Sequence, residues 1–377
     1  MDFLSANRNE LLASLSLVSG IVDRKHTDEI YANVLLEKSA GQVRMVATDA
    51  EIQMTAPMDG LTAEKDEAIT VNARILQDVL KVLPAGAQVD FILDGEKLNI
   101  KSGKSRYTLQ TLPAEEFTRI KETDDESASF SLNKSELKKL FAHTQYAMGA
   151  NEPRLFLNGT LMKIENKTLA IAATDGHRLA LATKALNDNI DDKEIVLPRK
   201  TVLELNRLIA NTGAEDAPIK ITILGSNKKQ VRFELNGVEM ISKVLDVTYP
   251  DYNPIIPKPE KNKAIFSRTA LLAALQRVAV VVSMENSTRA IHFSFDNGKV
   301  MISANNQKNE DAQEEMEVEF TGETPVELVY NLQYLTDLLN NVEGERVVLG
   351  FDDEKTTALI TVEGNDQFKY AVMPVRL

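Results

Sequence analysis

The chain has 377 residues, 43 of them Lys or Arg and 56 Asp or Glu, so its formal net charge is −13 at pH 7. At roughly 150 residues per domain this length predicts two or three domains, and the acidic balance argues against a protein held on nucleic acid by net charge alone. Because the sequence has no cysteine, four scattered histidines, no apolar stretch of about 18 residues and no signal-peptide pattern, we expect a cytoplasmic protein without metal, cofactor or membrane segment.

The first third of the chain predicts two successive βαβββ units, each entered by a short strand. Asn7 is a helix N-cap residue and Glu10 follows three positions later, as in a capping box. A second helix should stop before Pro84 and Gly86. The expected elements are a helix over 7–19, strands over 31–37, 43–47 and 52–56, a helix over 73–83, and strands over 89–93, 98–101 and 107–111.

This pattern occurs three times along the chain. The run Asn-Arg-Asn-Glu at 7–10 is echoed by Asn-Lys-Ser-Glu at 133–136, and Ala-Thr-Asp at 47–49 recurs at 173–175, both at an offset of 126 residues. A looser third copy begins at Phe266. Internal repeats of this kind indicate repeated structural units. We therefore predict an α+β protein with three similar domains of two βαβββ halves each, at residues 1–122, 128–250 and 262–377.

Charge is distributed unevenly between helices and strands. The six expected helices together carry +6, which leaves −19 on the rest of the chain. If the helices share one face, that face is basic and could follow a phosphate backbone. Alternatively, Lys and Arg are good helix formers on solvated faces. The six ranges are 4–19, 73–83, 133–147, 199–211, 267–283 and 331–341.

A second charge asymmetry separates the first and third domains. Lys97, Lys101, Lys104 and Arg106 lie on the last strands of the first domain, whereas 309–319 in the third domain is rich in glutamate. The alternation through 315–320 predicts one strand with a charged face and an apolar face. Such a strand could simply protect a sheet edge from aggregation. It could also join the basic edge of a second chain head to tail.

Enzymatic readings of the sequence are weak. Asp175 and His177 could form an acid–base pair in a hydrolase, but an equivalent Thr-Asp pair at 48–49 has no histidine after it, which favours turn chemistry. The run Ser-Gly-Lys-Ser at 102–105 leads into a strand and lacks the earlier glycine of a phosphate-binding loop. We therefore predict no catalytic residue.

Four segments of the chain resemble bacterial sliding clamps, the beta subunit of DNA polymerase III holoenzyme. They are Ala-Thr-Asp-Gly-His-Arg-Leu-Ala at 173–180, Ser-Gly-Lys-Ser-Arg-Tyr at 102–107, Tyr-Pro-Asp-Tyr at 249–252 and Val-Met-Pro-Val-Arg-Leu at 372–377. The resemblance covers the full chain. It implies a DNA-clamp fold and a head-to-tail homodimer, a six-domain ring with helices lining the pore and sheets outside. It also implies a non-catalytic processivity factor for DNA replication at the nucleoid, without 3′–5′ exonuclease activity.

The resemblance implies two sets of contacts on this ring. Duplex DNA would be bound without sequence specificity, through backbone contacts, by Arg24, Arg74, Asn151, Arg154, Lys200 and Arg207. The homodimer interface would comprise Lys104, Arg106, Tyr107, Leu109, Val281, Val282, Glu315 and Glu317. The basic residues could instead be solvated charges on helix faces.

The resemblance further implies a cleft between the second and third domains that binds short peptide motifs. The partners would be the replicative polymerase alpha subunit, the clamp-loader delta subunit, other polymerases and repair proteins. Pro254 stands where the family often has a basic residue. An alternative for the whole protein is a scaffold that binds other proteins without encircling DNA. An alternative for the apolar cleft residues is that they only close a core between two domains. The implied lining is Leu157, Thr174, Gly176, His177, Arg178, Leu179, Pro250, Ile255, Asn331, Tyr334, Val372, Met373, Pro374, Val375 and Arg376.

Overall fold

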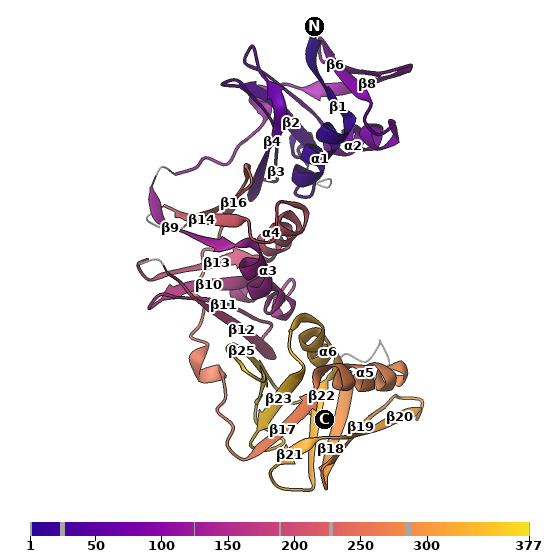
Figure 1. Ribbon diagram of the computed structural model, residues 1–377, viewed down its shortest axis with the longest axis vertical. Coiled ribbons are helices and arrows are strands. Elements are labelled where there is room, and N and C mark those ends of the chain that lie inside the picture. The colour runs from indigo at the N-terminus through magenta and orange to yellow at the C-terminus, as the bar shows by residue number, and fades with distance from the viewer. Residues whose placement is uncertain are drawn as a thin grey trace. The chain divides into compact units, whose positions relative to one another are not determined.

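The computed structural model describes residues 2–22, 27–123, 125–187, 190–225, 229–282 and 289–376. The chain forms two compact units, residues 1–136 with 203–244 and residues 137–202 with 245–377. Figure 1 shows the helices and strands of both units. In the described part of the chain, no helix has the length and apolar character needed to cross a membrane.

The first copy of the repeat folds as two βαβββ halves, as predicted. A 3₁₀ turn, Glu29–Ala32, precedes the second strand, and another, Ala114–Glu116, follows the last one. The elements are β1 (Asp2–Asn7), α1 (Arg8–Val18), β2 (Asn33–Ser39), β3 (Gln42–Thr48), β4 (Ile52–Thr62), β5 (Glu67–Asn72), α2 (Ala73–Val82), β6 (Gln88–Asp94), β7 (Lys97–Ser102) and β8 (Ser105–Leu112).

The second copy has the same order of elements. It also contains two 3₁₀ turns, Gln145–Ala147 and Leu155–Asn158, between its first helix and the next strand. The elements are β9 (Glu126–Asn133), α3 (Lys134–Ala142), β10 (Gly159–Glu165), β11 (Thr168–Thr174), β12 (Arg178–Ala185), β13 (Lys193–Pro198), α4 (Arg199–Asn211), β14 (Pro218–Leu224), β15 (Gln230–Leu235) and β16 (Val238–Lys243).

The third copy follows the pattern with one additional strand. A 3₁₀ turn, Asn253–Ile255, lies before it, and another, Ala279–Val281, follows its first helix. The elements are β17 (Asn262–Ser267), α5 (Arg268–Val278), β18 (Ala290–Asp296), β19 (Lys299–Asn305), β20 (Asp311–Glu317), β21 (Glu319–Thr321), β22 (Val326–Asn331), α6 (Leu332–Asn341), β23 (Arg346–Phe351), β24 (Ala358–Val362) and β25 (Asn365–Val372).

The helices begin at the capping residues that the sequence places before them. The side chains of Asn7, Asn72 and Asn331 each accept a hydrogen bond from a backbone N–H group in the first turn of the helix that follows. In the second copy the Glu136 carboxylate accepts from the backbone N–H of Asn133 at 3.1 Å. These bonds satisfy donors that have no partner inside the helix, so local sequence fixes where these helices start.

Several expected boundaries are wrong. The strand predicted over 52–56 continues to Thr62, and the helix predicted over 267–283 ends at Val278, before a 3₁₀ turn. The strand predicted over 31–37 begins at Asn33, because the Asp28 carboxylate accepts from the N–H of Ile30 and holds 29–32 in a 3₁₀ turn. The helix predicted over 133–147 ends at Ala142. The hydroxyl of Thr144 donates to the carbonyl of Leu140 at 2.9 Å, which lets a side chain compete with continued helix.

The single glutamate-rich strand predicted through 315–320 is also wrong. The chain leaves β20 after Glu317, and β20 pairs with β19 while β21 pairs with β17 in a different sheet. At the junction Val318 is buried and its N–H donates to the carbonyl of Gly298 at 3.0 Å. The alternation of charged and apolar residues therefore continues across a change of sheet.

Antiparallel pairing continues from one copy of the repeat into the next. In the first unit β4 of copy one pairs with β16 of copy two, within a sheet of order β1-β6-β7-β8-β5-β2-β3-β4-β16-β15-β14-β9. In the second unit β12 of copy two pairs with β25 of copy three, within a sheet of order β13-β10-β11-β12-β25-β24-β23-β17-β21. A smaller sheet has the order β20-β19-β18-β22. Consecutive copies are thus joined by backbone hydrogen bonds between strands as well as by the linkers.

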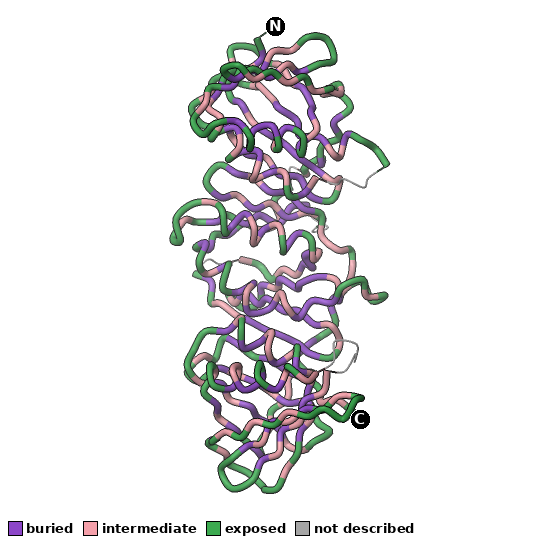
Figure 2. The backbone as a smooth tube through the Cα atoms, turned by 90° about the vertical axis from the view of Figure 1, so that its right-hand side faces the viewer, coloured by how far each residue is buried: buried purple, intermediate pink, exposed green. Residues whose placement is uncertain are grey.

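The cores lie between the sheets and the apolar faces of the helices. Helix α1 packs on β4 and beside α2, and α5 packs beside α6 (Figure 1). Leu11, Leu15 and Val18 of α1 are fully buried, which is the spacing of one helical face. Figure 2 shows buried residues gathered inside the chain trace and exposed residues mainly in the loops at its outside.

Candidate functional site

The turn between β11 and β12 is built by the side chains of Thr174 and Asp175. The Thr174 hydroxyl donates to the carbonyl of Arg178 at 2.6 Å and accepts from the N–H of Gly176 at 3.0 Å. One Asp175 oxygen accepts from the N–H groups of His177 and Arg178. Gly176 has φ +92°, a backbone conformation that residues with a Cβ rarely adopt.

The same turn occurs in the first copy of the repeat. The Thr48 hydroxyl donates to the carbonyl of Ile52, and the Asp49 carboxylate accepts from the N–H groups of Glu51 and Ile52. The Thr-Asp pair is therefore turn chemistry, as the sequence predicts. In the second copy Arg178 takes the place of the buried Ile52, so of these two turns the second is the one that carries a buried cation.

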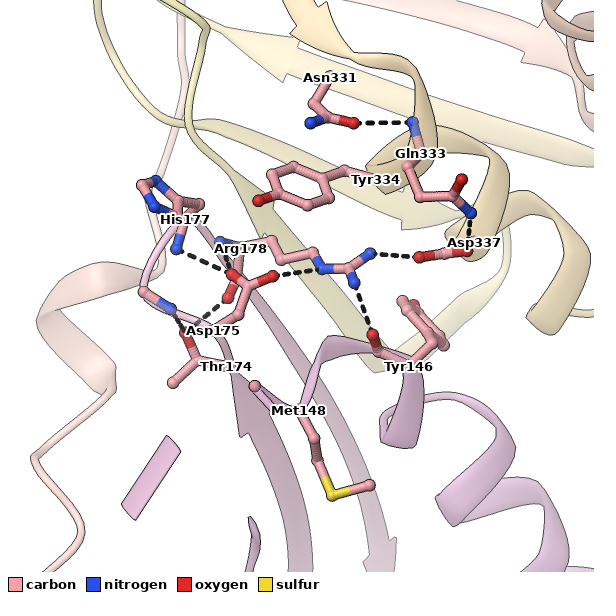
Figure 3. Close-up of polar contacts among 12 residues, drawn as sticks. Tyr146, Met148, Thr174, Asp175, His177, Arg178, Asn331, Gln333, Tyr334 and Asp337 are labelled. Atoms are coloured by element: carbon pink, nitrogen blue, oxygen red, sulfur yellow. Dashed lines mark hydrogen bonds and ion pairs between the residues drawn. The ribbon is translucent and has the colours of Figure 1, made fainter. Parts of the chain in front are cut away.

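Arg178 connects three separate segments of the second unit (Figure 3). Its side chain is only 8% exposed, and its Nε lies 2.9 Å from Asp175 Oδ2 while Nη1 lies 2.7 Å from Asp337 Oδ2 on α6. Nη2 donates to the carbonyl of Tyr146 at 2.6 Å. The guanidinium carbon lies 4.4 Å from the centre of the Tyr334 ring, a cation–π contact. We call these five residues the Arg178 network.

The electrostatics of this network keep the arginine charged. Burial opposes the charge on Arg178, but Tyr370, Asp337 and Asp175 raise its pKa above the usual value. Burial raises the pKa of the Tyr370 hydroxyl, which donates to the carbonyl of Tyr334 at 3.0 Å. Because a buried charge is tolerated only when it is paired and hydrogen-bonded, Asp175 is committed to Arg178. It does not serve as the carboxylate partner of a catalytic His177, whose side chain is exposed.

The carboxyl-terminal segment reaches this turn directly. Strand β25 pairs with β12 so that Val372 lies opposite Arg178. Beyond the strand, the N–H of Met373 donates to the carbonyl of His177 at 3.0 Å, and the N–H of Val375 donates to the carbonyl of Val329 at 2.8 Å. Both strand β25 and the residues beyond it therefore contact the 176–179 segment.

A cavity of about 620 Å³ lies where these elements meet. Seven of the implied cleft residues line it, and the β23–β24 loop adds two that sequence reasoning missed. That loop offered only a short polar run between two strands as a signal. The lining consists of His177, Asn331, Tyr334, Lys355, Thr357, Met373, Pro374, Val375 and Arg376.

The other implied cleft residues do not line this cavity. Leu157, Leu179 and Val372 are buried to 1% exposure or less, and Leu179 packs in a core with Tyr249 and other apolar side chains. Thr174, Gly176 and Arg178 form the turn behind the cavity. Pro250 and Ile255 are exposed on the segment that leads into the third copy, as is Pro254. The implied set therefore divides into lining residues, buried supports and an exposed neighbouring segment.

The implied DNA-facing residues have different surroundings. Arg74 is exposed on α2, 3.7 Å from Asp78, and Lys200 is exposed in the first turn of α4. Asn151 is exposed with φ +59°. Arg154 is exposed and its guanidinium lies beside Gly176, close enough that a Cβ there would be 2.7 Å from Nη2. Arg24 lies outside the described residues.

Arg207 differs from these residues because its donors are used within the first unit. Its Nη1 and Nη2 donate to the carbonyls of Ser16 and Leu17, each at 2.7 Å, and Nε lies 2.7 Å from Glu204. The guanidinium occupies the space where a Cβ on Gly20 would lie. A cation at the carboxyl end of α1 satisfies terminal carbonyls and the helix dipole, so Arg207 fixes α1 against α4.

The implied interface residues lie on two strand edges and a 3₁₀ turn. Residues 105–110 of β8 pair with β7, and β20 pairs with β19. Glu315 is already 2.7 Å from Lys299 of its own chain. Lys104, Arg106 and Glu317 are exposed, and Tyr107, Leu109, Val281 and Val282 are half-buried.

Comparison with protein families gives three matches along the chain. They are the N-terminal domain of the DNA polymerase III beta subunit over residues 1–121, its central domain over 131–251 and its C-terminal domain over 253–376. Together they cover nearly the whole sequence, in the order of the three repeats.

Related proteins and solved structures agree with these matches. The beta sliding clamps of Pseudomonas putida and Escherichia coli K12 are 35% and 31% identical, over 98% and 99% of both chains. The crystal structure of the DNA polymerase III subunit beta from Pseudomonas aeruginosa has a TM-score of 0.92 at 34% identity, with complete coverage of both chains. The chain therefore belongs to the DNA polymerase III beta subunit family.

Proposed function

We propose that this DNA sliding clamp, a non-catalytic subunit of the polymerase, works as a homodimeric ring around duplex DNA at the nucleoid. The cavity beside the Arg178 network is the observation that carries the docking part of the proposal. Its apolar wall of Met373, Pro374 and Val375, next to polar Asn331 and His177, suits a short peptide with apolar anchor residues. Met373 is 41% exposed, and methionine adapts to several partners.

The partners of this cavity are the polymerase alpha subunit, the clamp-loader delta subunit, other polymerases and repair proteins. Sliding clamps from Pseudomonas aeruginosa and Bartonella birtlesii have been solved bound to griselimycin, so clamps of this family accept a ligand. The residues on the 250–255 segment and the buried Leu157, Leu179 and Val372 support the peptide site without lining the cavity.

The homodimer forms head to tail through the β8 edge of one chain and the β20 edge of another. Both edges are open along most of their length among the described strands, and open edges pair readily. Lys104 in the β7–β8 turn and Arg106 on β8 are complementary in charge to Glu317 on β20. Three domains per chain then give a six-domain ring.

DNA is held by enclosure, with a weak electrostatic contribution. Arg74, Lys200, Asn151 and Arg154 are exposed and are proposed to meet the phosphate backbone, together with Arg24, whereas Arg207 positions α1. Phosphate contacts carry no sequence information, which suits a clamp that slides.

Retention on DNA tests this proposal against a scaffold that does not encircle DNA. Protein loaded by a clamp loader onto nicked circular DNA should stay bound through gel filtration at high salt, and cutting the circle once should release it. A non-encircling scaffold would dissociate from circles and linear fragments at the same rate, and that result would overturn the ring.

A further inference from the structure

We propose that the cavity selects peptides with a carboxylate beside their apolar anchor residues, and that the amine of Lys355 binds this carboxylate. The inference rests on the proposed peptide-binding function and adds the charge of the ligand. It assigns a specificity role to a loop residue that the resemblance did not supply.

The charge of the cavity lining is opposite to that of the protein. The lining contains Lys355 and Arg376 together with the exposed His177, and it contains no aspartate or glutamate, although the whole chain carries −13. The nearest network carboxylates, Asp175 and Asp337, are both paired with Arg178. A ligand carboxylate would therefore meet cationic side chains next to the apolar wall, while the carboxylates of the same loop, Asp352, Asp353 and Glu354, lie outside the lining.

The β23–β24 loop holds Lys355 in a defined place. Asp353 accepts from the backbone N–H groups of Lys355 at 2.8 Å and Thr356 at 2.9 Å, which closes an Asx turn. One residue earlier, Asp352 accepts from the N–H groups of residues 260 and 261, so the loop is fastened to the segment that enters the third copy. The backbone is thus fixed before any ligand arrives.

The side chain of Lys355 remains accessible on this fixed loop. It is 82% exposed, and its amine lies 3.5 Å from the carboxylate of its neighbour Glu354. Glu354 is itself 57% exposed and does not belong to the lining. An ion pair between such exposed groups is weak, so a ligand carboxylate that also anchors apolar side chains in the cavity displaces it.

A peptide scan against charge variants of the full-length protein tests the proposal. The parent is a fluorescent synthetic peptide with glutamine, leucine and phenylalanine anchors, and each other position is replaced in turn by Asp, Asn or Lys. Each peptide is made with a free and with an amidated terminus, which separates a side-chain carboxylate from a terminal one. Affinities are measured by anisotropy for wild type, Lys355→Gln and Lys355→Glu. Lys167→Glu, an exposed lysine in the β10–β11 turn outside the lining, is the matched control.

Wild type and the Lys167→Glu variant should prefer Asp over Asn, or the free over the amidated terminus, by about two- to fivefold, as expected for an exposed ion pair. Lys355→Gln should remove this preference, and Lys355→Glu should reverse it in favour of the Lys peptide. Equal carboxylate preferences in wild type and both Lys355 variants would overturn the inference while leaving peptide docking intact. Failure of the parent peptide to bind wild type would overturn the peptide site itself.

Discussion

Arg178 shows how one residue can separate two turns that are otherwise alike. The turn at 48–52 and the turn at 174–178 have the same Thr and Asp hydrogen bonds, but the first ends in buried Ile52 and the second in a buried cation. The cation needs carboxylates, and one of them, Asp337, comes from α6 in the third copy. The exchange of isoleucine for arginine at one turn position thus creates an ion pair between the second and third copies at the edge of the cavity.

Replacing Arg178 with Met should destabilise the second unit by about 3 kcal/mol, the low end of the cost of breaking a buried ion pair. Asp175 and Asp337 are 15% and 23% exposed, so each would be left partly buried without its partner. Arg178→Lys should recover only part of this loss, because one ammonium cannot replace a planar fork with three contacts. Guanidinium unfolding measures the change. The exposed Arg74→Met variant is the control, and equal midpoints for both Met variants would contradict the assigned role of the network.

His143 should make stability depend on pH below neutrality. Burial, followed by nearby Lys139, lowers the pKa of His143 to about 4, against an opposing effect of Glu343. The unfolded chain, with a histidine pKa of about 6.5, therefore binds a proton between about pH 6.5 and 4 that the folded chain does not. Lowering the pH favours the state that binds more protons, which in this window is the unfolded state. The melting temperature should therefore drop as the pH is lowered from about 6.5 to 4.

A His143→Phe variant isolates this contribution. Phenylalanine keeps the edge contact with Phe368 and cannot titrate, so the variant should lose less stability than wild type between pH 7 and 5. His292→Phe controls for removal of a histidine elsewhere. The same pH dependence in wild type and His143→Phe would show that other groups cause it.

At the scale of elements, the sequence predicts what is local and misses what is distant. Helix starts follow from Asn7, Asn72 and Asn331, whose side chains act within a few residues. The pairings of β4 with β16 and of β12 with β25 join residues far apart in sequence, and no periodicity specifies them. Such pairing is decided by tertiary packing.

The candidate site was predictable to a similar extent. The resemblance supplied His177, Tyr334 and the carboxyl-terminal residues, which the structure brings to one cavity. The sequence of the loop that contains Lys355 does not indicate that this residue lies beside the carboxyl-terminal segment. Arg207 has the sequence pattern of an ordinary exposed cation on a helix. Only the folded chain shows that Arg207 donates to two carbonyls at the end of α1.

The carboxyl-terminal segment should be required for peptide binding and dispensable for the dimer. Removing residues 373–377 deletes four of the residues that line the cavity, and with them the hydrogen bonds to His177 and Val329. Loss of pocket hot spots typically costs about 2 kcal/mol or more, so peptide affinity should fall at least about thirtyfold.

Fluorescence anisotropy with the synthetic peptide measures this loss, and light scattering should still report a dimer. An Arg376→Ala variant, which shortens one exposed side chain at the end of the segment, should weaken binding far less. Peptide affinity within threefold of wild type after the truncation would place the binding site elsewhere.

At the scale of the whole molecule, the first and third copies of the repeat each keep an open strand edge, on β8 and on β20. Between consecutive copies, antiparallel strands satisfy backbone groups on both sides of each junction. Over residues 105–110, the side of β8 that faces away from β7 has no strand partner among the described residues, and neither has the side of β20 that faces away from β19. In the proposed homodimer, a second copy of the chain would supply each open edge with the other, in a contact that closes when the rotation between subunits permits.

Apolar packing should dominate the stability of this dimer. Each fully buried aliphatic or aromatic side chain contributes about 1.5 to 3 kcal/mol, whereas an exposed ion pair contributes about 0 to 1 kcal/mol. Glu315 is moreover already paired with Lys299 of its own chain. Val280 is 84% exposed and Val281 and Val282 are half-buried, so we propose the 3₁₀ turn after α5 as the apolar centre opposite Tyr107 and Leu109.

The double variant Val281→Asp/Val282→Asp should therefore be a monomer by multi-angle light scattering at micromolar concentration, while wild type remains a dimer even in high salt. Tyr107→Asp, on the opposite edge, should give the same result, because each interface uses both surfaces. Val82→Asp on α2, where the valine is 72% exposed, introduces the same charge elsewhere and should leave the dimer intact. Circular dichroism would verify that the monomeric variants are folded. Dimers in both interface variants would refute this assignment of the interface, since two carboxylates cannot be buried there without a large desolvation cost.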